Sequence, residues 1–213
     1  MKTIYTIVKR LLSSNKISYF ITFIVVLCAT STKEATLSNG NYTWLLALIS
    51  PFFFVFYDYK KLMYLGVSKK DYFLGSLVSY GILAILISFM NTMFYVLIDP
   101  THHANNLMEI CGWTKNGVVI AAIQQMFFLF LCMIILHVLL SMQTHWYGYV
   151  VDAIVIIILG VFIPIAPLRH GLSSFFKIIM LNANALLHLG VCLLLGVSFS
   201  LIGLEILKKS SFI

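Results

Sequence analysis

The chain has 213 residues, of which 61% are hydrophobic and only 10% are charged, and its mean hydropathy is +1.00. This composition is typical of a helical integral membrane protein and excludes an ordinary soluble domain. The formal net charge is +7. Beside apolar segments such an excess sets membrane topology and meets anionic lipid, so we expect no nucleic-acid partner.

Residues 1–16 are predicted to form an amphipathic helix that lies on the inner leaflet of the membrane. Apolar residues recur at the spacing of one helical face, and the basic residues fall elsewhere. The alternative is a disordered basic leader. The apolar face consists of Ile4, Ile7, Val8, Leu11 and Leu12, and the basic residues are Lys2, Lys9, Arg10 and Lys16.

Six apolar segments follow, and each is expected to cross the membrane. They cover approximately residues 17–31, 42–57, 72–98, 117–142, 149–166 and 185–207. The fourth and fifth are separated only by residues 143–148, so we expect these two to be antiparallel neighbours. With the N-terminus inside, the outer segments hold only four basic residues, Lys33, Lys115, Arg169 and Lys177. We therefore expect an all-α integral membrane protein with six transmembrane helices and both termini cytoplasmic.

The most charged stretch, residues 58–75, lies between the second and third apolar segments. We expect an ordered helix-turn-helix over residues 58–71, in which Gly66 ends a short helix and Ser68 caps the next. Asp71 completes a capping-box pattern with Ser68. Four basic residues accompany this turn: Lys60, Lys61, Lys69 and Lys70. The alternative is a plain capped turn whose lysines touch lipid headgroups.

Residues 167–184 are too polar to span and too apolar for a free loop. We interpret them as a re-entrant segment or an interfacial helix pair on the outer side, with Phe175 and Phe176 among its apolar residues.

Two ionisable residues fall inside apolar segments at similar predicted depth, His137 in the fourth and Asp152 in the fifth. Buried ionisable groups in lipid are candidates for function. We expect the two to hydrogen-bond and fix the hairpin between their segments, and a proton relay is the alternative.

The sequence contains no nucleotide-binding phosphate loop and no protease signature, so we expect no enzymatic activity in this chain. The outer loop carries metal-ligand types at a spacing that matches no zinc site, and no metal is expected. These residues are His102, His103, Glu109 and Cys111.

This layout resembles a permease subunit of the type-2 ABC transporters, which are exporters. The segment from Leu65 to Gly75 is similar to the Gly-x-Ser-Arg/Lys-x-x-(Phe/Tyr) turn of Gram-positive members. The resemblance implies a bacterial plasma membrane location, two permease subunits, identical or homologous, and separate ATPase subunits that bind ATP and Mg. It also implies that this chain binds no cofactor and that the dimer interface involves the first and fifth spans.

The resemblance further implies that residues 58–71 form a coupling helix that transmits ATPase closure to the second and third spans. The amphipathic N-terminal helix would brace the same contact. The coupling residues would be Lys60, Lys61, Gly66, Ser68, Lys69, Lys70 and Asp71, and Phe175 and Phe176 would belong to an outer gate.

The implied mechanism is alternating access, and the implied substrate is amphipathic: an antimicrobial or toxin peptide, a drug or a lipid. Two other classes of function remain open. One is a non-transporting membrane immunity or scaffold protein, and the other is a membrane-embedded enzyme that uses His137 and Asp152.

Overall fold

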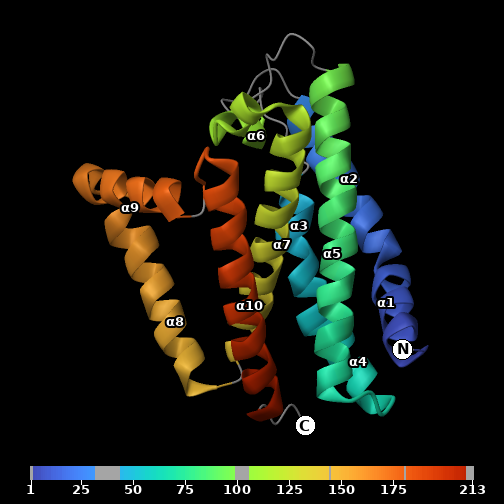
Figure 1. The fold of residues 1–213 in the computed structure, drawn as a ribbon. Coiled ribbons are helices and arrows are strands. Elements are labelled where there is room, and N and C mark those ends of the chain that lie inside the picture. The colour runs from blue at the N-terminus through green and yellow to red at the C-terminus, as the bar shows by residue number, and fades with distance from the viewer. Residues whose placement is uncertain (1, 32–43, 99–105, 144, 180, 210–213) are drawn as a thin grey trace.

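The computed structural model describes residues 2–31, 44–98, 106–143, 145–179 and 181–209. Throughout these ranges the regular structure is helical, without a β-strand (Figure 1). The helical elements are α1 (Lys2–Ser14), α2 (Lys16–Ser31), α3 (Leu45–Phe52), the π-helix η1 (Phe53–Asp58), α4 (Tyr59–Tyr64), α5 (Lys69–Met93), the π-helix η2 (Phe94–Ile98), α6 (Leu107–Ile110), the 3-10 helix η3 (Trp113–Asn116), α7 (Val118–Met142), α8 (Trp146–Ile157), the π-helix η4 (Ile158–Phe162), α9 (Ala166–Ile179) and α10 (Ala185–Lys209).

Three helices in the described ranges are long and apolar enough to cross a membrane: Lys69–Leu97, Val118–Met142 and Ala185–Lys209. The 25 residues of α7 reach about 37 Å at ~1.5 Å per residue, which exceeds a hydrocarbon core of ~30 Å. The chain is therefore a helical membrane protein. The other three predicted crossings coincide with shorter helical segments, α2, α3 with η1, and α8 with η4.

Helix α7 lies at the centre of the bundle, with α5, α3 and α10 around it (Figure 1). Large side chains fill the space between them, including Phe54, Tyr80 and Met133, all fully buried. Helices α7 and α10 approach closely because Gly203 has no side chain. A Cβ atom there would lie 2.9 Å from Val138 Cγ2 and 2.7 Å from the Phe73 ring.

The predicted N-terminal helix is present as α1, but its apolar face does not lie free for the leaflet. Ile7 and Leu11 are buried in the main core. Ile7 packs onto α5 where Gly75 leaves room, since a Cβ atom on Gly75 would come within 2.6 Å of Ile7 Cγ2. The apolar face of this amphipathic helix therefore packs against the rest of the protein.

Helices α8 and α9 leave the bundle. The turn from α7 into α8 is tight, because a Cβ atom on Gly148 would lie 2.6 Å from the Met142 carbonyl oxygen. From there α8 leans away from α7 and α10, and most of its side chains are exposed (Figure 1). The prediction of close antiparallel neighbours thus holds at the turn and is wrong farther along α8.

The segment before α10 also differs from its prediction. It contains one continuous helix, α9, where the sequence suggested a re-entrant segment or a helix pair. Figure 1 shows α9 running crosswise at the C-terminal end of α8, without inserting between the long helices of the bundle. A single helix forms because the segment from Ala166 to Ile179 contains no proline after Pro167, which lies in its first turn.

Candidate functional site

The turn between α4 and α5 has the local structure that the sequence predicts. Gly66 has φ 77° and follows the end of α4. Its N–H donates to the Met63 carbonyl at 2.9 Å, and the Val67 N–H donates to the Leu62 carbonyl at 3.1 Å. These two bonds form a Schellman motif, which needs a residue in the left-handed region and therefore favours glycine.

Ser68 caps α5, as predicted. Its hydroxyl accepts from the Asp71 N–H at 3.0 Å and donates to the Asp71 carboxylate at 2.8 Å. The predicted capping box differs in one bond, because the Asp71 carboxylate is held by the Ser68 hydroxyl and not by the Ser68 backbone N–H. The turn is nevertheless ordered by its own side chains.

Helix α4 is anchored to the bundle by its buried face. Tyr59 and Leu62 are 1% and 2% exposed, and the Tyr59 ring packs edge-on against Tyr72 of α5, with the centroids 4.9 Å apart. The Tyr72 hydroxyl donates to the Phe54 carbonyl of η1 at 2.9 Å. Through these contacts η1, α4 and the first turns of α5 form one connected unit.

A π-helical segment directly precedes α4. Pro51 lies inside α3 and has no N–H to donate, and the wider turns of η1 follow at Phe53–Asp58. Wide turns of this kind are frequent at functional sites and shift the register of the helix that follows. Here they bring the carboxylate of Asp58 inward, where it is 3% exposed.

Asp58 connects this unit to the N-terminal helices. The Asn15 side chain, between α1 and α2, donates to the Asp58 carboxylate and to the Leu11 carbonyl. Sequence reasoning missed this contact. The available signal was an asparagine at a helix junction and an aspartate directly after an apolar segment.

The four lysines of the turn are not equivalent. Lys61 lies over the Tyr57 ring, 3.3 Å from its centroid, and Lys69 is only partly exposed. Lys60 and Lys70 are exposed and point their charge toward solvent at this end of the molecule. We call it the α4 end; the start of α1 and the end of α10 lie there too (Figure 1).

His137 and Asp152 do not pair, so the predicted bond between them is wrong. The Tyr80 hydroxyl hydrogen-bonds to His137 Nδ1 at 2.7 Å, and His137 Nε2 has no hydrogen-bond partner among the described residues. Asp152 instead accepts from Gln143 Nε2 at 2.7 Å. The reason is geometric, because His137 faces α5 while α8 leans away.

The His137 ring lies in an aromatic cluster formed with α5. The ring centroids of Tyr72, Phe73 and Tyr80 are 5.8, 5.3 and 5.7 Å away, and the side chain is fully buried. Three aromatic rings and one hydrogen bond thus fix the imidazole in place. The arrangement is that of a packing contact between α5 and α7.

A second polar cluster, not anticipated from the sequence, lies toward the opposite end. We call that end, which carries α6, η3 and α9, the α9 end (Figure 1). Asn91 of α5 donates to Gln125 Oε1 at 2.8 Å and to Asn106 Oδ1 at 3.1 Å, and all three side chains are buried. The signal was present, since amides inside apolar segments need partners in lipid.

The linker between α9 and α10 is held by side chains from η3. Trp113 Nε1 donates to the Asn182 carbonyl at 3.1 Å, and Asn116 Nδ2 donates to the Ala183 carbonyl at 2.6 Å. Phe175 and Phe176 lie farther along α9, where they are 56% and 38% exposed and contact each other with ring centroids 5.8 Å apart. Their part in an outer gate stays a prediction.

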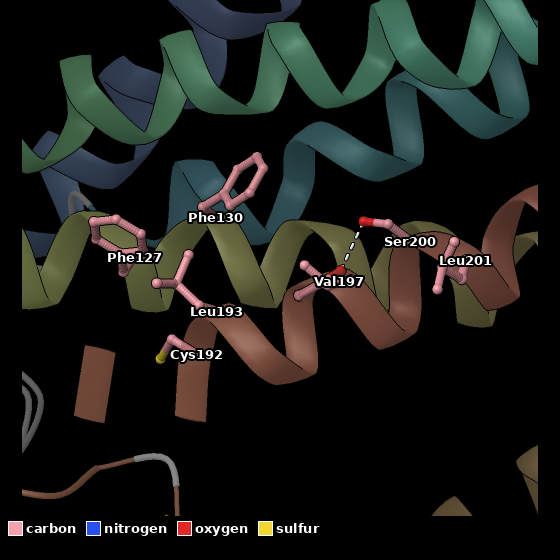
Figure 2. Close-up of a pocket in the computed structure, with 8 residues that line it drawn as sticks. Phe127, Phe130, Cys192, Leu193, Val197, Ser200 and Leu201 are labelled. Carbon is pink, nitrogen blue, oxygen red and sulfur yellow. Dashed lines mark hydrogen bonds between the residues drawn. The ribbon is translucent and has the colours of Figure 1, made fainter. Parts of the chain in front are cut away.

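Apolar grooves run along the bundle, among them one at α10 and one at α2. One, of about 200 Å³, lies between α7 and α10 (Figure 2). Gly196 is among its lining residues, and the Ser200 hydroxyl donates to the Gly196 carbonyl at 2.7 Å. The other, of about 460 Å³, lies between α2, α3 and α5 and has Lys16 at its margin. Its walls are mostly apolar and aromatic: Leu12, Tyr19, Phe20, Phe23, Leu46, Ser50, Leu83, Leu86, Ile87 and Met90.

The predicted metal-ligand types of the outer loop are only partly within the described residues. Glu109 and Cys111 are described, and His102 and His103 lie outside. No group of three or more metal-ligating side chains occurs in the part of the chain that the structure describes.

Comparison with protein-family models, curated proteins and solved structures found no match for this chain.

Proposed function

We propose that this chain is the membrane-spanning subunit of a type-2 ABC exporter in the bacterial plasma membrane. It would move an amphipathic substrate outward with ATP hydrolysed by separate subunits. The observation that carries the proposal is the turn between α4 and α5: a short capped helix, anchored on its inner face, with lysines exposed on its outer face.

Such a turn suits the transmission of movement. A displacement of α4 would be transmitted to α5 through the Tyr59–Tyr72 contact, and to α1 and α2 through the hydrogen bond from Asn15 to Asp58. The turn is rigid because both of its ends are capped by local hydrogen bonds. A partner that binds α4 would thus rotate several helices together, which is how a binding event becomes a domain movement.

In the membrane topology that we propose, the α4 end lies in the cytoplasm. Its exposed lysines, with those of α1 and α10, favour the inner side under the positive-inside rule. Six helical segments would cross: α2, α3 with η1, α5 with η2, α7, α8 with η4, and α10. A second permease subunit, identical or homologous, would complete the pathway.

The substrate class is inferred from surface chemistry. The groove between α2, α3 and α5 is apolar and aromatic with a lysine at its margin, which suits a molecule with an apolar body and a polar end. Among amphipathic substrates we rank an antimicrobial or toxin peptide first, ahead of a drug or lipid. The mechanism is alternating access without covalent chemistry in this chain, and ATP and Mg bind to the partner.

The test is a pull-down of the detergent-solubilised full chain from its native host. The wild type is compared with a variant in which Lys60 and Lys70 are changed to Glu. Lys61 and Lys69 stay unchanged because their side chains are engaged or partly buried. We expect an ATPase subunit to co-purify with the wild type and to be lost from the variant, since two charges at its docking surface are reversed.

The matched control changes Lys208 and Lys209 to Glu, which is the same charge change at the same end but outside the turn. This control should retain the ATPase. An ATPase that binds all three proteins would support an ABC permease and refute the α4 contact. No ATPase with the wild type would refute the permease, and a non-transporting immunity or scaffold protein would then be the better proposal.

A further inference from the structure

A cleft of about 520 Å³, lined by charged, polar and apolar residues, opens at the α9 end. One wall is residues 109–112 with Lys115, and the other is Lys177 and Ile178 with residues 181–183. A volume of ~300–1,000 Å³ is typical of sites for small ligands. None of these residues belongs to the turn between α4 and α5.

The cleft carries two basic side chains that have no acidic partner. Lys115 and Lys177 are exposed, and neither ammonium forms an ion pair or a hydrogen bond with any residue that the structure describes. Glu109, the acidic residue of the lining, accepts a hydrogen bond from the Tyr95 hydroxyl at 3.3 Å. The cleft therefore has an excess of positive charge, which attracts an anion.

Cys111 and Lys177 lie in opposite walls of the cleft. Burial raises the pKa of Cys111 to about 12, and the Lys177 ammonium opposes that rise.

The two walls are held together before any ligand binds. Trp113 Nε1 and Asn116 Nδ2 donate to the carbonyls of Asn182 and Ala183 in the opposite wall. Gly112 has φ 72°, in the left-handed region that favours glycine, and it lies beside Ala183: a Cβ atom at Gly112 would be in ordinary van der Waals contact with Ala183 Cβ, at 3.8 Å. A preformed cleft loses little conformational entropy when it binds a ligand.

The depth of the cleft indicates where the anion comes from. Lys115 lies three residues before the start of α7, a helix long enough to span the hydrocarbon core. Groups just beyond the end of such a helix lie among lipid headgroups. The rest of the lining includes the apolar side chains Ile110, Ile178 and Leu181.

We propose that this cleft binds an anionic phospholipid from the leaflet at the α9 end. Lys115 and Lys177 contact the headgroup phosphate, and Ile110, Ile178 and Leu181 contact the glycerol and the upper acyl chain. The site does not depend on the proposed transport function.

The test measures the dissociation constants of phosphatidylglycerol and of phosphatidylcholine for the full chain in neutral detergent by native mass spectrometry. The variant changes Lys115 and Lys177 to Gln. We expect the wild type to prefer phosphatidylglycerol and the variant to bind it roughly thirtyfold more weakly, because each lysine beside an anionic lipid contributes about a factor of five. Binding of phosphatidylcholine should not change.

The matched control changes Arg169 and Lys209 to Gln; Arg169 is a basic residue of α9 that does not line the cleft. It should bind phosphatidylglycerol like the wild type, and so should a variant with Arg at both positions 115 and 177. Three results would overturn the proposal: no preference in the wild type, equal losses in the Gln variant and the control, or displacement of the lipid by an equal concentration of glycerol 3-phosphate. The last would identify a site for a soluble phosphate.

Discussion

At the scale of single residues, the bundle depends on a few polar side chains buried among apolar ones. Asn15 holds Asp58, Tyr80 holds His137, and Asn91 holds Gln125. A buried polar group without a hydrogen-bond partner has lost its hydration and gained nothing in return, which destabilises the fold. Each of these contacts therefore constrains which helix faces meet.

A measurement can distinguish the observed Tyr80–His137 hydrogen bond from the His137–Asp152 bond that the sequence suggested. In a double-mutant cycle, Tyr80→Phe and His137→Phe should couple by about 1 kcal/mol, because they remove the two ends of one hydrogen bond. Asp152→Asn and His137→Phe should be additive within about 0.5 kcal/mol. The measurement is the free energy of unfolding in detergent. Coupling in the second cycle and additivity in the first would contradict the structure.

A substitution at Gly66 tests the effect of backbone conformation on stability, separately from any change in side-chain packing. Its φ is 77°, and a Cβ atom added there would meet no other atom within 4 Å. Gly66→Ala should therefore cost about 1–2 kcal/mol of unfolding free energy from the left-handed conformation alone. Gly66→Asn should cost less, since asparagine tolerates that region.

The control for Gly66 is Gly81→Ala, at a glycine inside α5 where an added Cβ atom would also meet nothing within 4 Å. Alanine should stabilise the helix there by about 1 kcal/mol. Both effects are read from the free energy of unfolding in detergent. Equal effects at the two positions would refute the Schellman turn.

At the scale of elements, the α4 end is one mechanical unit made from segments that are separate in sequence. Helix α1 packs on α5, α4 packs on α5 through Tyr59, and Asn15 connects α1 to η1. The turn between α4 and α5 is therefore held by contacts with α5 on one side and, through η1, with α1 on the other. A partner bound at α4 would act on the N-terminal helix as well.

The contact between α1 and α5 can be tested at Gly75. Gly75→Ala places a methyl group against Ile7 and should destabilise the protein by about 1–3 kcal/mol through overpacking. Adding Ile7→Ala should cost less in this background than in the wild type, because it removes the clash. The measurements are thermal unfolding and the rate of proteolysis near α1. If the two substitutions are additive, α1 does not pack on α5 as described.

At the scale of the whole molecule, the bundle has two chemically different ends joined by long apolar helices. The α4 end carries the capped turn and the ends of α1 and α10, and the α9 end carries the amide cluster and the lysine-containing cleft. Helix α5 connects them. If it spans the membrane, the two ends face opposite compartments.

This topology predicts opposite labelling of two introduced cysteines in a variant without native cysteines. Tyr64→Cys lies at the α4 end, where the residue is 85% exposed, and Lys115→Cys lies at the α9 end. A membrane-impermeant maleimide should label position 115 in intact cells and position 64 only after permeabilisation. Labelling of both positions in intact cells would mean that α5 does not cross the membrane.

The sequence alone determined the features that depend on near neighbours. The apolar composition required buried backbone hydrogen bonds and hence helices. Gly66 and Ser68 specified the end of α4 and the start of α5, because a cap involves residues only a few positions apart. The amphipathic spacing of residues 4–12 likewise specified the helix α1.

Only the tertiary structure decided which surfaces meet. Helix α7 has apolar residues on all sides, so its sequence does not show which neighbouring helix its His137 faces, and the hydrogen-bond partner Tyr80 is 57 positions away. The same uncertainty concealed the Asn15–Asp58 bond, the docking of α1 on Gly75 and the departure of α8 and α9 from the bundle. The physical reason is that hydrophobicity favours burial without direction, whereas partner choice depends on shape and on hydrogen bonds between distant segments.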